Sequence, residues 1–189
     1  MDTQAIARSW ILWSVIAGAI AALLTEVIPV PAIGGVIVGF AQWLLVRKFH
    51  HVSTLWILAT TIGVAVLGYL MSFAGLLYAP FKVHQLTTMV PGIFIVFSAV
   101  GVVGGIATGT LQALVAYRTR ALFLRWTYMT MLGFGVAAAL LAISNPGYYG
   151  LDSLYANPIV HAARSALFWL AASVPESITL GRIASPSRS

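Results

Sequence analysis

The chain contains no cysteine and few charged residues, and each of these features excludes some classes of protein. Among 189 residues there are four acidic and ten basic side chains. Without cysteine the chain has no disulfide framework, no thiolate metal site and no cysteine nucleophile. A soluble domain has about a quarter of its residues charged, whereas the charged fraction here is 7%. Most of the exterior must therefore face lipid.

Apolar residues are abundant instead: they make up 60% of the chain, and its mean hydropathy is +0.97. These values are typical of an integral membrane protein. The formal net charge of +6 suggests a nucleic-acid partner at first sight. However, the basic residues cluster at the ends of apolar runs, where they orient membrane proteins. The sequence therefore predicts the lipid bilayer as a partner and no nucleic acid.

Six apolar stretches have about the twenty residues that cross a bilayer as a helix. They cover residues 9–28, 31–48, 54–75, 91–117, 123–143 and 158–175. This pattern predicts an all-α, polytopic transmembrane helix bundle of six spans, with residues 1–189 forming a single domain. The sixth stretch contains His161 and Arg164, so five spans plus an amphipathic interfacial helix is the alternative.

Basic residues are divided unevenly between the two sets of segments that six spans expose. The set with both termini carries eight of them: Arg8, Arg47, Lys48, Arg118, Arg120, Arg125, Arg182 and Arg188. The opposite set carries only Lys82. Because positively charged segments stay in the cytoplasm, we expect a multi-pass protein of the bacterial plasma (inner) membrane with both termini cytoplasmic.

A motif of glycines and a glutamine occurs twice, seventy residues apart, with nine identities in the 33 aligned positions 34–66 and 104–136. The two copies are Gly34-Gly35-x3-Gly39-x2-Gln42-x-Leu44 and Gly104-Gly105-x3-Gly109-x2-Gln112-x-Leu114. The repeat units are approximately residues 31–75 and 101–143. Each unit holds two helices, an even number, so both copies enter the membrane in the same direction as a parallel repeat.

The repeated residues share helix faces, since they are spaced i, i+4, i+7. If each hairpin is tight, Gln42 lies opposite Thr60 and Gly39 opposite Gly63, and the second copy pairs in the same way. Small residues allow close helix approach, and an amide and a hydroxyl satisfy each other where water is absent. The expected helix-packing residues are Gly35, Gly39, Gln42, Thr60, Gly63, Gly105, Gly109, Gln112, Thr130 and Gly133.

Two interpretations of this stripe remain open. In the first it is helix–helix packing, and Trp56 and Trp126 are interfacial anchors. In the second, Gln42 and Gln112 line a solute path near the repeat axis. Both glutamines lie five or six residues from an arginine, about 8 Å from the membrane boundary, which is shallow for a central binding site.

A second polar group of residues is expected on the other side of the membrane. Glu26, His161 and Arg164 lie nearest the hydrocarbon there, and intramembrane charges are usually paired or functional. Glu26 and Arg164 either form an ion pair or extend independently to the headgroups. This surface suits a headgroup, a small anion or a partner protein, unless it is an ordinary solvated surface.

The sequence contains no recognisable catalytic or cofactor motif such as G-x-S-x-G, H-E-x-x-H or a P-loop. His50 and His51 are adjacent and have no acidic residue nearby in sequence, so we expect no metal site. Asp152, His161 and Ser165 do not suggest a hydrolytic triad, because the last two lie one turn apart on one helix. We therefore expect a non-enzymatic protein without a cofactor.

Residues 35–47 and 56–63 resemble small multi-pass bacterial membrane proteins of unassigned function. These carry a G-x-x-x-G-x-x-Q-W-L-x-x-R helix followed by a W-x-L-A-x-x-x-G helix, often twice. The resemblance covers residues 31–68 well and 101–137 loosely, since Ala113 replaces the tryptophan and Tyr117 the arginine. It implies a helical membrane bundle and transfers no functional site.

The leading functional expectation is a structural or accessory subunit whose small-residue faces pack helices within itself or onto a larger membrane complex. A membrane-protein partner or a homo-oligomer fits this expectation. The alternative is a small-solute transporter or channel built around the repeat axis. A transporter predicts Gln42 and Gln112 facing a polar cavity, whereas a packing module predicts a dry seam.

Overall fold

The computed structural model describes residues 3–25, 31–48, 52–78, 89–117, 119–145 and 157–184. Every regular element in these ranges is an α-helix, which confirms the all-α prediction. The helices are α1 (Thr3–Thr25), α2 (Pro31–Val46), α3 (Leu55–Tyr78), α5 (Val90–Ala116), α6 (Arg120–Ile143) and α8 (Pro158–Ala184). They lie within two or three residues of the six expected stretches at most ends, except that α1 begins earlier and α8 ends later.

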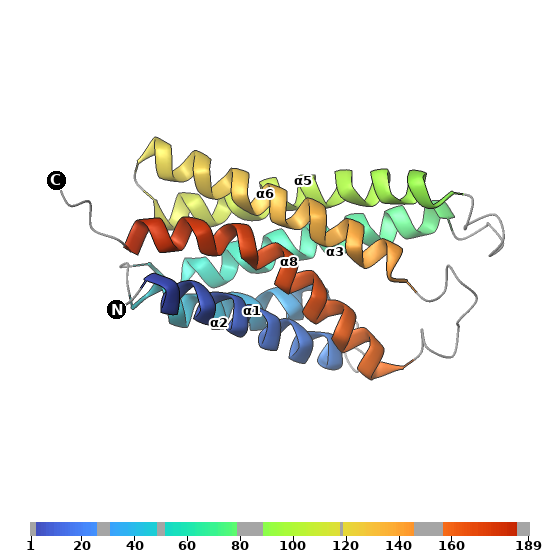
Figure 1. The fold of residues 1–189 in the computed structure, drawn as a ribbon, viewed down its shortest axis with the longest axis horizontal. Coiled ribbons are helices and arrows are strands. Elements are labelled where there is room, and N and C mark those ends of the chain that lie inside the picture. Colours follow the sequence, from blue (N-terminus) through green and yellow to red (C-terminus); the bar gives the residue numbers. More distant parts are fainter. Residues whose placement is uncertain are drawn as a thin grey trace.

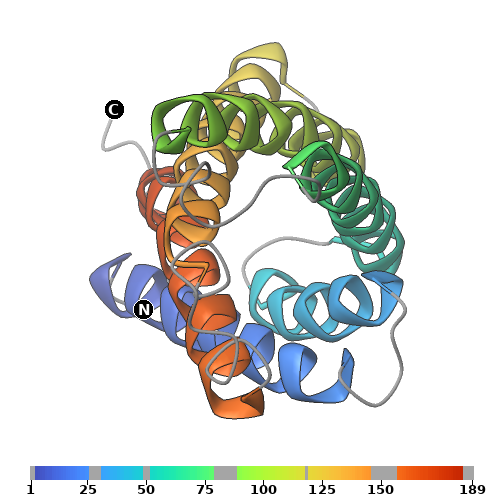
Figure 2. The same cartoon turned by 90° about the vertical axis from the view of Figure 1, so that its right-hand side faces the viewer.

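The six helices form a closed ring in which each runs against its two neighbours. Contacts follow the order α1, α2, α3, α5, α6, α8 and return to α1, and Figure 2 shows this ring along the bundle. Successive helices alternate in direction, so α1 begins and α8 ends at the same end of the molecule (Figure 1). We call this end, which carries Arg8, Arg47, Lys48, Arg120 and Arg125, the basic end.

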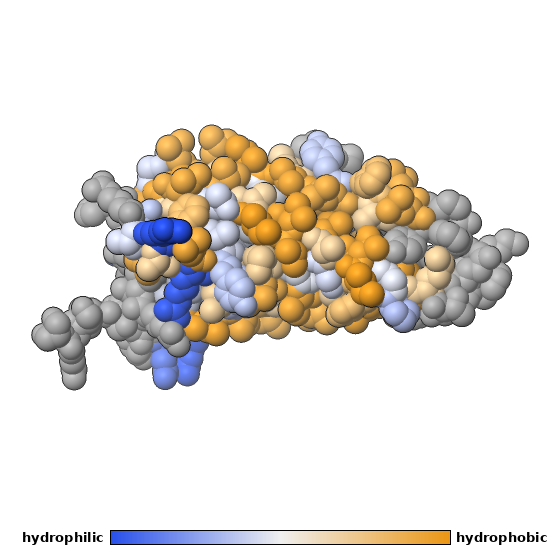
Figure 3. Space-filling model, turned by 90° about the horizontal axis from the view of Figure 1, so that it is seen from above, coloured by the Kyte–Doolittle hydropathy of each residue, from blue (hydrophilic) through white to orange (hydrophobic). Residues whose placement is uncertain are grey.

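The lipid-compatible exterior follows from the composition. Four helices, α1, α3, α5 and α6, are long and apolar enough to cross a membrane, and α2 is a shorter apolar helix. Large apolar side chains such as Leu12, Tyr69, Phe73, Ile95 and Leu114 are exposed. Apolar colouring dominates the middle of the surface in Figure 3, and the strongly hydrophilic atoms gather at one end.

Helix α8 is part of the ring and does not lie across one end of it. It packs lengthwise between α1 and α6, so the structure favours the six-helix bundle over five helices plus an interfacial one. Pro175 lies inside the helix, where it has no N–H to donate and bends the chain. Figure 1 shows α8 changing direction about midway.

Glycines set the spacing within two helix pairs, α2–α3 and α5–α6. A Cβ atom on Gly35 would lie 2.6 Å from Cα of Thr61 in α3, and one on Gly105 would lie 2.7 Å from Cα of Met131 in α6. Residues 61 and 131 are seventy apart, like the two glycines. A side chain at either glycine would therefore push the two backbones of its pair apart.

The expected facing of Gly39 with Gly63, and of Gly109 with Gly133, is wrong. Gly39 and Gly109 face their own pair, since a Cβ on either would lie 2.9 Å from Cβ of Thr60 or Thr130. Gly63 and Gly133 instead face the next pair, against Thr108 of α5 and Ala172 of α8. Within each pair, one helix is shifted along the other by about one turn relative to the tight hairpin that we expected. Gly63 and Gly133 therefore allow close contact between neighbouring pairs and not within a pair.

Candidate functional sites: a polar tryptophan layer and an interhelical pocket

Three tryptophans meet inside the ring in the half nearer the basic end. Trp10, Trp56 and Trp126 are at most 1% exposed. Their ring centroids are 5.6 to 6.3 Å apart in edge-to-face contacts, a favourable arrangement for aromatic rings. The expectation that Trp56 and Trp126 anchor the protein at the membrane surface is therefore wrong, because both belong to the core.

The glutamines lie beside these rings and are also buried, each 1% exposed. Gln42 Nε2 donates to Oγ of Ser14 on α1 (3.2 Å), and Gln112 Nε2 donates to Oγ1 of Thr60 on α3 (2.8 Å). The expected pairs Gln42–Thr60 and Gln112–Thr130 are thus wrong. Each amide bonds to a hydroxyl of the neighbouring helix pair, because that pair supplies the next wall of the ring.

Glu176 completes this arrangement from α8, and the sequence analysis did not include it. Trp126 Nε1 donates to Oε1 of Gln112 (3.0 Å), and Trp10 Nε1 donates to Oε2 of Glu176 (3.1 Å). The α1–α8 pair therefore repeats the contact made by the α5–α6 pair. The hydroxyl of Thr130 lies beside the Glu176 carboxyl group without reaching hydrogen-bonding geometry.

A sequence signal for this third set exists on α1. Trp10, Ser14 and Ala17 have the spacing W-x3-[ST]-x2-[AG] that is also found at Trp56-Thr60-Gly63 and Trp126-Thr130-Gly133. The set is hard to find because its two helices lie at opposite ends of the chain and glutamate stands where the others have glutamine. We call the nine residues the tryptophan–amide layer: Trp10, Trp56, Trp126, Gln42, Gln112, Glu176, Ser14, Thr60 and Thr130.

The tryptophan–amide layer is nearly, but not fully, satisfied. Gln112 Nε2 also approaches Oε1 of Gln42, at 3.4 Å. Trp56 Nε1 is buried without a hydrogen-bond partner among the residues that the structure describes. The Thr130 hydroxyl is also buried without a hydrogen bond to the residues that the structure describes. A buried unpaired polar group costs about 1–3 kcal/mol, so these two groups are the weakest points of the layer.

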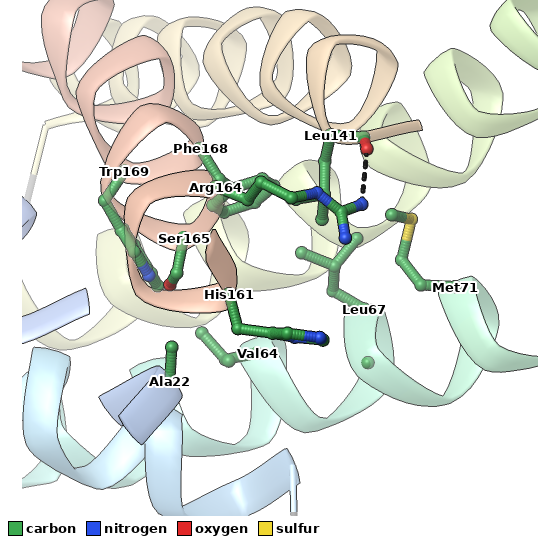
Figure 4. A pocket seen from close by; sticks show the side chains of 11 residues that line it. Ala22, Val64, Leu67, Met71, Leu141, His161, Arg164, Ser165, Phe168 and Trp169 are labelled. Carbon is green, nitrogen blue, oxygen red and sulfur yellow. Dashed lines mark hydrogen bonds between the residues drawn. The ribbon is translucent and has the colours of Figure 1, made fainter. Parts of the chain in front are cut away.

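A pocket of about 330 Å³ lies inside the ring in the half away from the basic end. Its walls come from α1, α3, α6 and α8, and Figure 4 shows its side chains. Most of them are apolar, and the polar ones come from α8. The lining residues are Ala22, Val64, Leu67, Gly68, Met71, Leu141, His161, Arg164, Ser165, Phe168 and Trp169.

The pocket brings together two of the three residues expected on this side, His161 and Arg164. Arg164 Nη2 donates to the backbone oxygen of Leu141, near the end of α6, at 2.8 Å (Figure 4). Ser165 Oγ donates to the backbone oxygen of Gly18 on α1, also at 2.8 Å. Glu26, and with it the expected Glu26–Arg164 pair, lies outside the described residues.

The two sites offer hydrogen-bonding groups and apolar contact surface. Within the described ranges, no group of three histidine or acidic side chains is placed to hold a metal ion. His50, His51 and Asp152 lie outside those ranges. The Ser165 hydroxyl donates to the backbone carbonyl of Gly18, whereas a serine nucleophile would donate to its general base.

The fold and these two sites define a helical membrane protein. Its ring is filled by a polar layer near the basic end and holds a pocket in the opposite half. No family model, no curated protein and no solved structure matches the chain.

Proposed function

We propose that the protein is a non-enzymatic integral membrane protein that binds a small amphiphilic molecule in the interhelical pocket. The observation that carries the proposal is the pocket itself, a space of about 330 Å³ inside the ring. Small-molecule sites of this kind are concave and mostly apolar, with a few convergent polar groups. The proposal extends the outer-side polar site expected from His161 and Arg164.

The lining indicates the class of ligand. Val64, Leu67, Met71 and Phe168 offer apolar contact, which suits a ring or a short hydrocarbon chain. His161 and Arg164 place N–H donors at the α8 wall, which suits a carboxylate or a phosphate group. The ligand is therefore an apolar body with one acidic group.

The direction of access follows from the tryptophan–amide layer. The Gln42 and Gln112 side chains are 1% exposed and do not line the pocket. The layer closes the ring toward the basic end, so we propose that the ligand enters from the opposite end. Gln42 and Gln112 then act in packing.

Binding is tested with water-soluble probes, by thermal unfolding of the purified protein in detergent. Benzoate and phenyl phosphate should raise Tm more than benzyl alcohol, because a ligand that binds only the folded state stabilises it. Val64→Phe, which fills the pocket, should abolish the shift. Ile62→Phe is the matched control, because Ile62 lies on the same helix and its side chain is 44% exposed on the outer surface.

Equal shifts for the acids and the alcohol, or an unchanged shift in Val64→Phe, would overturn the proposal. His161→Gln and Arg164→Lys separate the two donors. Each should reduce the difference between acid and alcohol while leaving the shift caused by benzyl alcohol unchanged.

Two alternative functions remain as proposals. A structural or accessory subunit is supported by the packing, although the glycines expected for docking are used inside the ring. A transporter or channel is supported by the pocket, but the tryptophan–amide layer would have to open below it. Copurification of another membrane protein supports the first, and solute flux in liposomes that Gln112→Leu changes supports the second.

We also propose that α2–α3 and α5–α6 are copies of one hairpin, in the parallel sense expected from the sequence. The matched contacts of Gly35 and Gly105 support this proposal. The bias of basic residues supports a cytoplasmic location of the basic end and both termini in a bacterial plasma membrane. Protease protection of a C-terminal tag in oriented vesicles tests the location.

A further inference from the structure

The helix pairs α2–α3, α5–α6 and α8–α1 meet in three contacts, and only two of these contacts contain a glycine at the point of closest approach. In α3–α5 the close residue is Gly63 against Thr108, and in α6–α8 it is Gly133 against Ala172. The corresponding residues of α1 and α2 follow from the spacing of the tryptophan–amide layer. They are Ala17 and Val38, and both are buried.

The α1–α2 contact therefore has a side chain at both positions, whereas each of the other two contacts has a glycine at one of them. A second pocket lies along this contact, with a volume of about 320 Å³. We call it the α1–α2 groove. It is lined by Trp13, Ile16, Ala17, Ile20, Ile37, Phe40, Ala41, Leu44, Leu45 and Lys48.

The groove is apolar along its length and charged at one end. Among the described residues that line it, Lys48 alone is charged, and it lies at the basic end. Trp13, Ile20 and Phe40 are 46 to 49% exposed, so the groove opens on the lipid-facing surface. It is therefore separate from the interhelical pocket, which lies inside the ring.

We propose that the α1–α2 groove binds an anionic glycerophospholipid of the membrane leaflet at the basic end. One acyl chain lies between α1 and α2, and the phosphate group contacts the Lys48 ammonium. Lysine extends to the headgroup region, and Lys48 lies at that end of the groove, whereas Trp13 lies beside the acyl chain.

The dimensions of the groove support a single lipid. From Ile37 to Val46 the groove follows nine helical steps of α2, about 14 Å at 1.5 Å per residue, and Lys48 lies two residues beyond the helix. Half of a bilayer's hydrocarbon core is about 15 Å thick. The groove thus has about the length of one leaflet, and its charged residue Lys48 lies where that leaflet's headgroups are.

Native mass spectrometry with matched lipids tests the proposal. Phosphatidylglycerol and phosphatidylcholine with the same acyl chains compete at equal concentration for the full-length protein in detergent. We expect one retained lipid and about a fivefold preference for phosphatidylglycerol, the effect of one lysine near an anionic headgroup. Lys48→Gln should remove the preference, whereas Arg120→Gln, at the same end but outside the groove, should keep it.

Filling the groove tests where the acyl chain lies. Ala41→Phe should reduce retention of both lipids. Quenching by lipids brominated on the acyl chain requires no core substitution, and the quenched component of the wild type should disappear in Trp13→Phe. The proposal is overturned if Lys48→Gln keeps the headgroup preference, if Trp13→Phe is quenched like the wild type, or if the groove is instead occupied by a second copy, seen as dimers that Ala41→Phe disrupts.

Discussion

Buried polar side chains have different hydrogen-bond partners in the two halves of the ring. Near the basic end, Gln42, Gln112 and Glu176 are 1% exposed and bond to side chains across the ring. In the other half, Arg164 and Ser165 bond to backbone carbonyls at the edge of a pocket of about 330 Å³. The first half fills its interior, and the second leaves a space.

We infer from this difference that the first half carries most of the stability, and the proposed function places ligand binding in the second half. A layer in which side chains satisfy one another loses a partner with every substitution. Donors held by backbone carbonyls are positioned independently of what fills the pocket. We therefore expect large stability effects in the tryptophan–amide layer and in the glycine contacts beside it, and ligand-dependent effects at the pocket.

The largest expected effect comes from closing the approach of α6 to α8. Gly133→Leu would place its side chain against the backbone of Ala172. Overpacking of a tight contact costs about 3 kcal/mol, which should lower Tm markedly or prevent folding in detergent. Gly92→Leu is the control, since nothing lies within 4 Å of a Cβ at that position. Equal losses in both variants would show that the contact is unimportant.

The next largest loss of stability is expected from replacing Gln112, and it should exceed the loss from replacing Gln42. Gln112→Leu removes the bonds to Thr60 and Trp126 and leaves the buried Trp126 Nε1 unpaired. We expect a loss of about 2 kcal/mol. Gln42→Leu removes the bond to Ser14 and a weak contact, so its loss should be about 1 kcal/mol. The free energies are measured by unfolding in SDS, and the reverse order would contradict the bonding scheme.

A smaller effect is expected when the α1–α8 pair is made to resemble the α5–α6 pair. Glu176→Gln keeps an oxygen that accepts from Trp10 and removes a carboxylate that is costly to bury. The variant should be as stable as the wild type or more stable. Glu176→Leu leaves Trp10 Nε1 unpaired and should lose about 1–2 kcal/mol. A Glu176→Gln protein as unstable as Glu176→Leu would mean that the charge itself is required.

The smallest expected difference is in stability between the variants Trp126→Phe and Trp56→Phe. Trp126→Phe removes a hydrogen bond to Gln112, whereas Trp56 Nε1 has no described partner to lose. Both variants lose similar ring area, so Trp126→Phe should be less stable than Trp56→Phe by about 1 kcal/mol. Unfolding of the two proteins under identical conditions gives the difference, and equal stability would argue against the Trp126–Gln112 bond.

Sequence reasoning predicted the helices because hydropathy reports directly on the lipid-facing surface. It also selected glycines and glutamines that the structure buries, such as Gly35, Gly105 and Gln112. It failed on their partners, since the sequence does not give the offset between helices. Gly63 therefore faces Thr108 rather than Gly39.

The tryptophans and the pocket could not be predicted from the sequence for a second reason, since both depend on closure of the ring. Tryptophan near the end of a membrane span is usually interfacial, and only the ring of neighbours makes Trp56 and Trp126 core residues. Trp10 and Glu176 lie 166 residues apart, so their contact depends on closure of the ring. The pocket depends on the same closure, because four helices form its walls.

The central claim is that the ring is closed near the basic end and accessible from the opposite end. The absence of cysteine allows a direct test with two single substitutions of one type, Ser14→Cys in the layer and Ser165→Cys in the pocket. Reaction with an anionic, membrane-impermeant methanethiosulfonate is measured from each side of oriented vesicles. The Ser165→Cys variant should react only from the side opposite the basic end, and the Ser14→Cys variant from neither side. Rapid labelling of Ser14→Cys from either side would contradict the account.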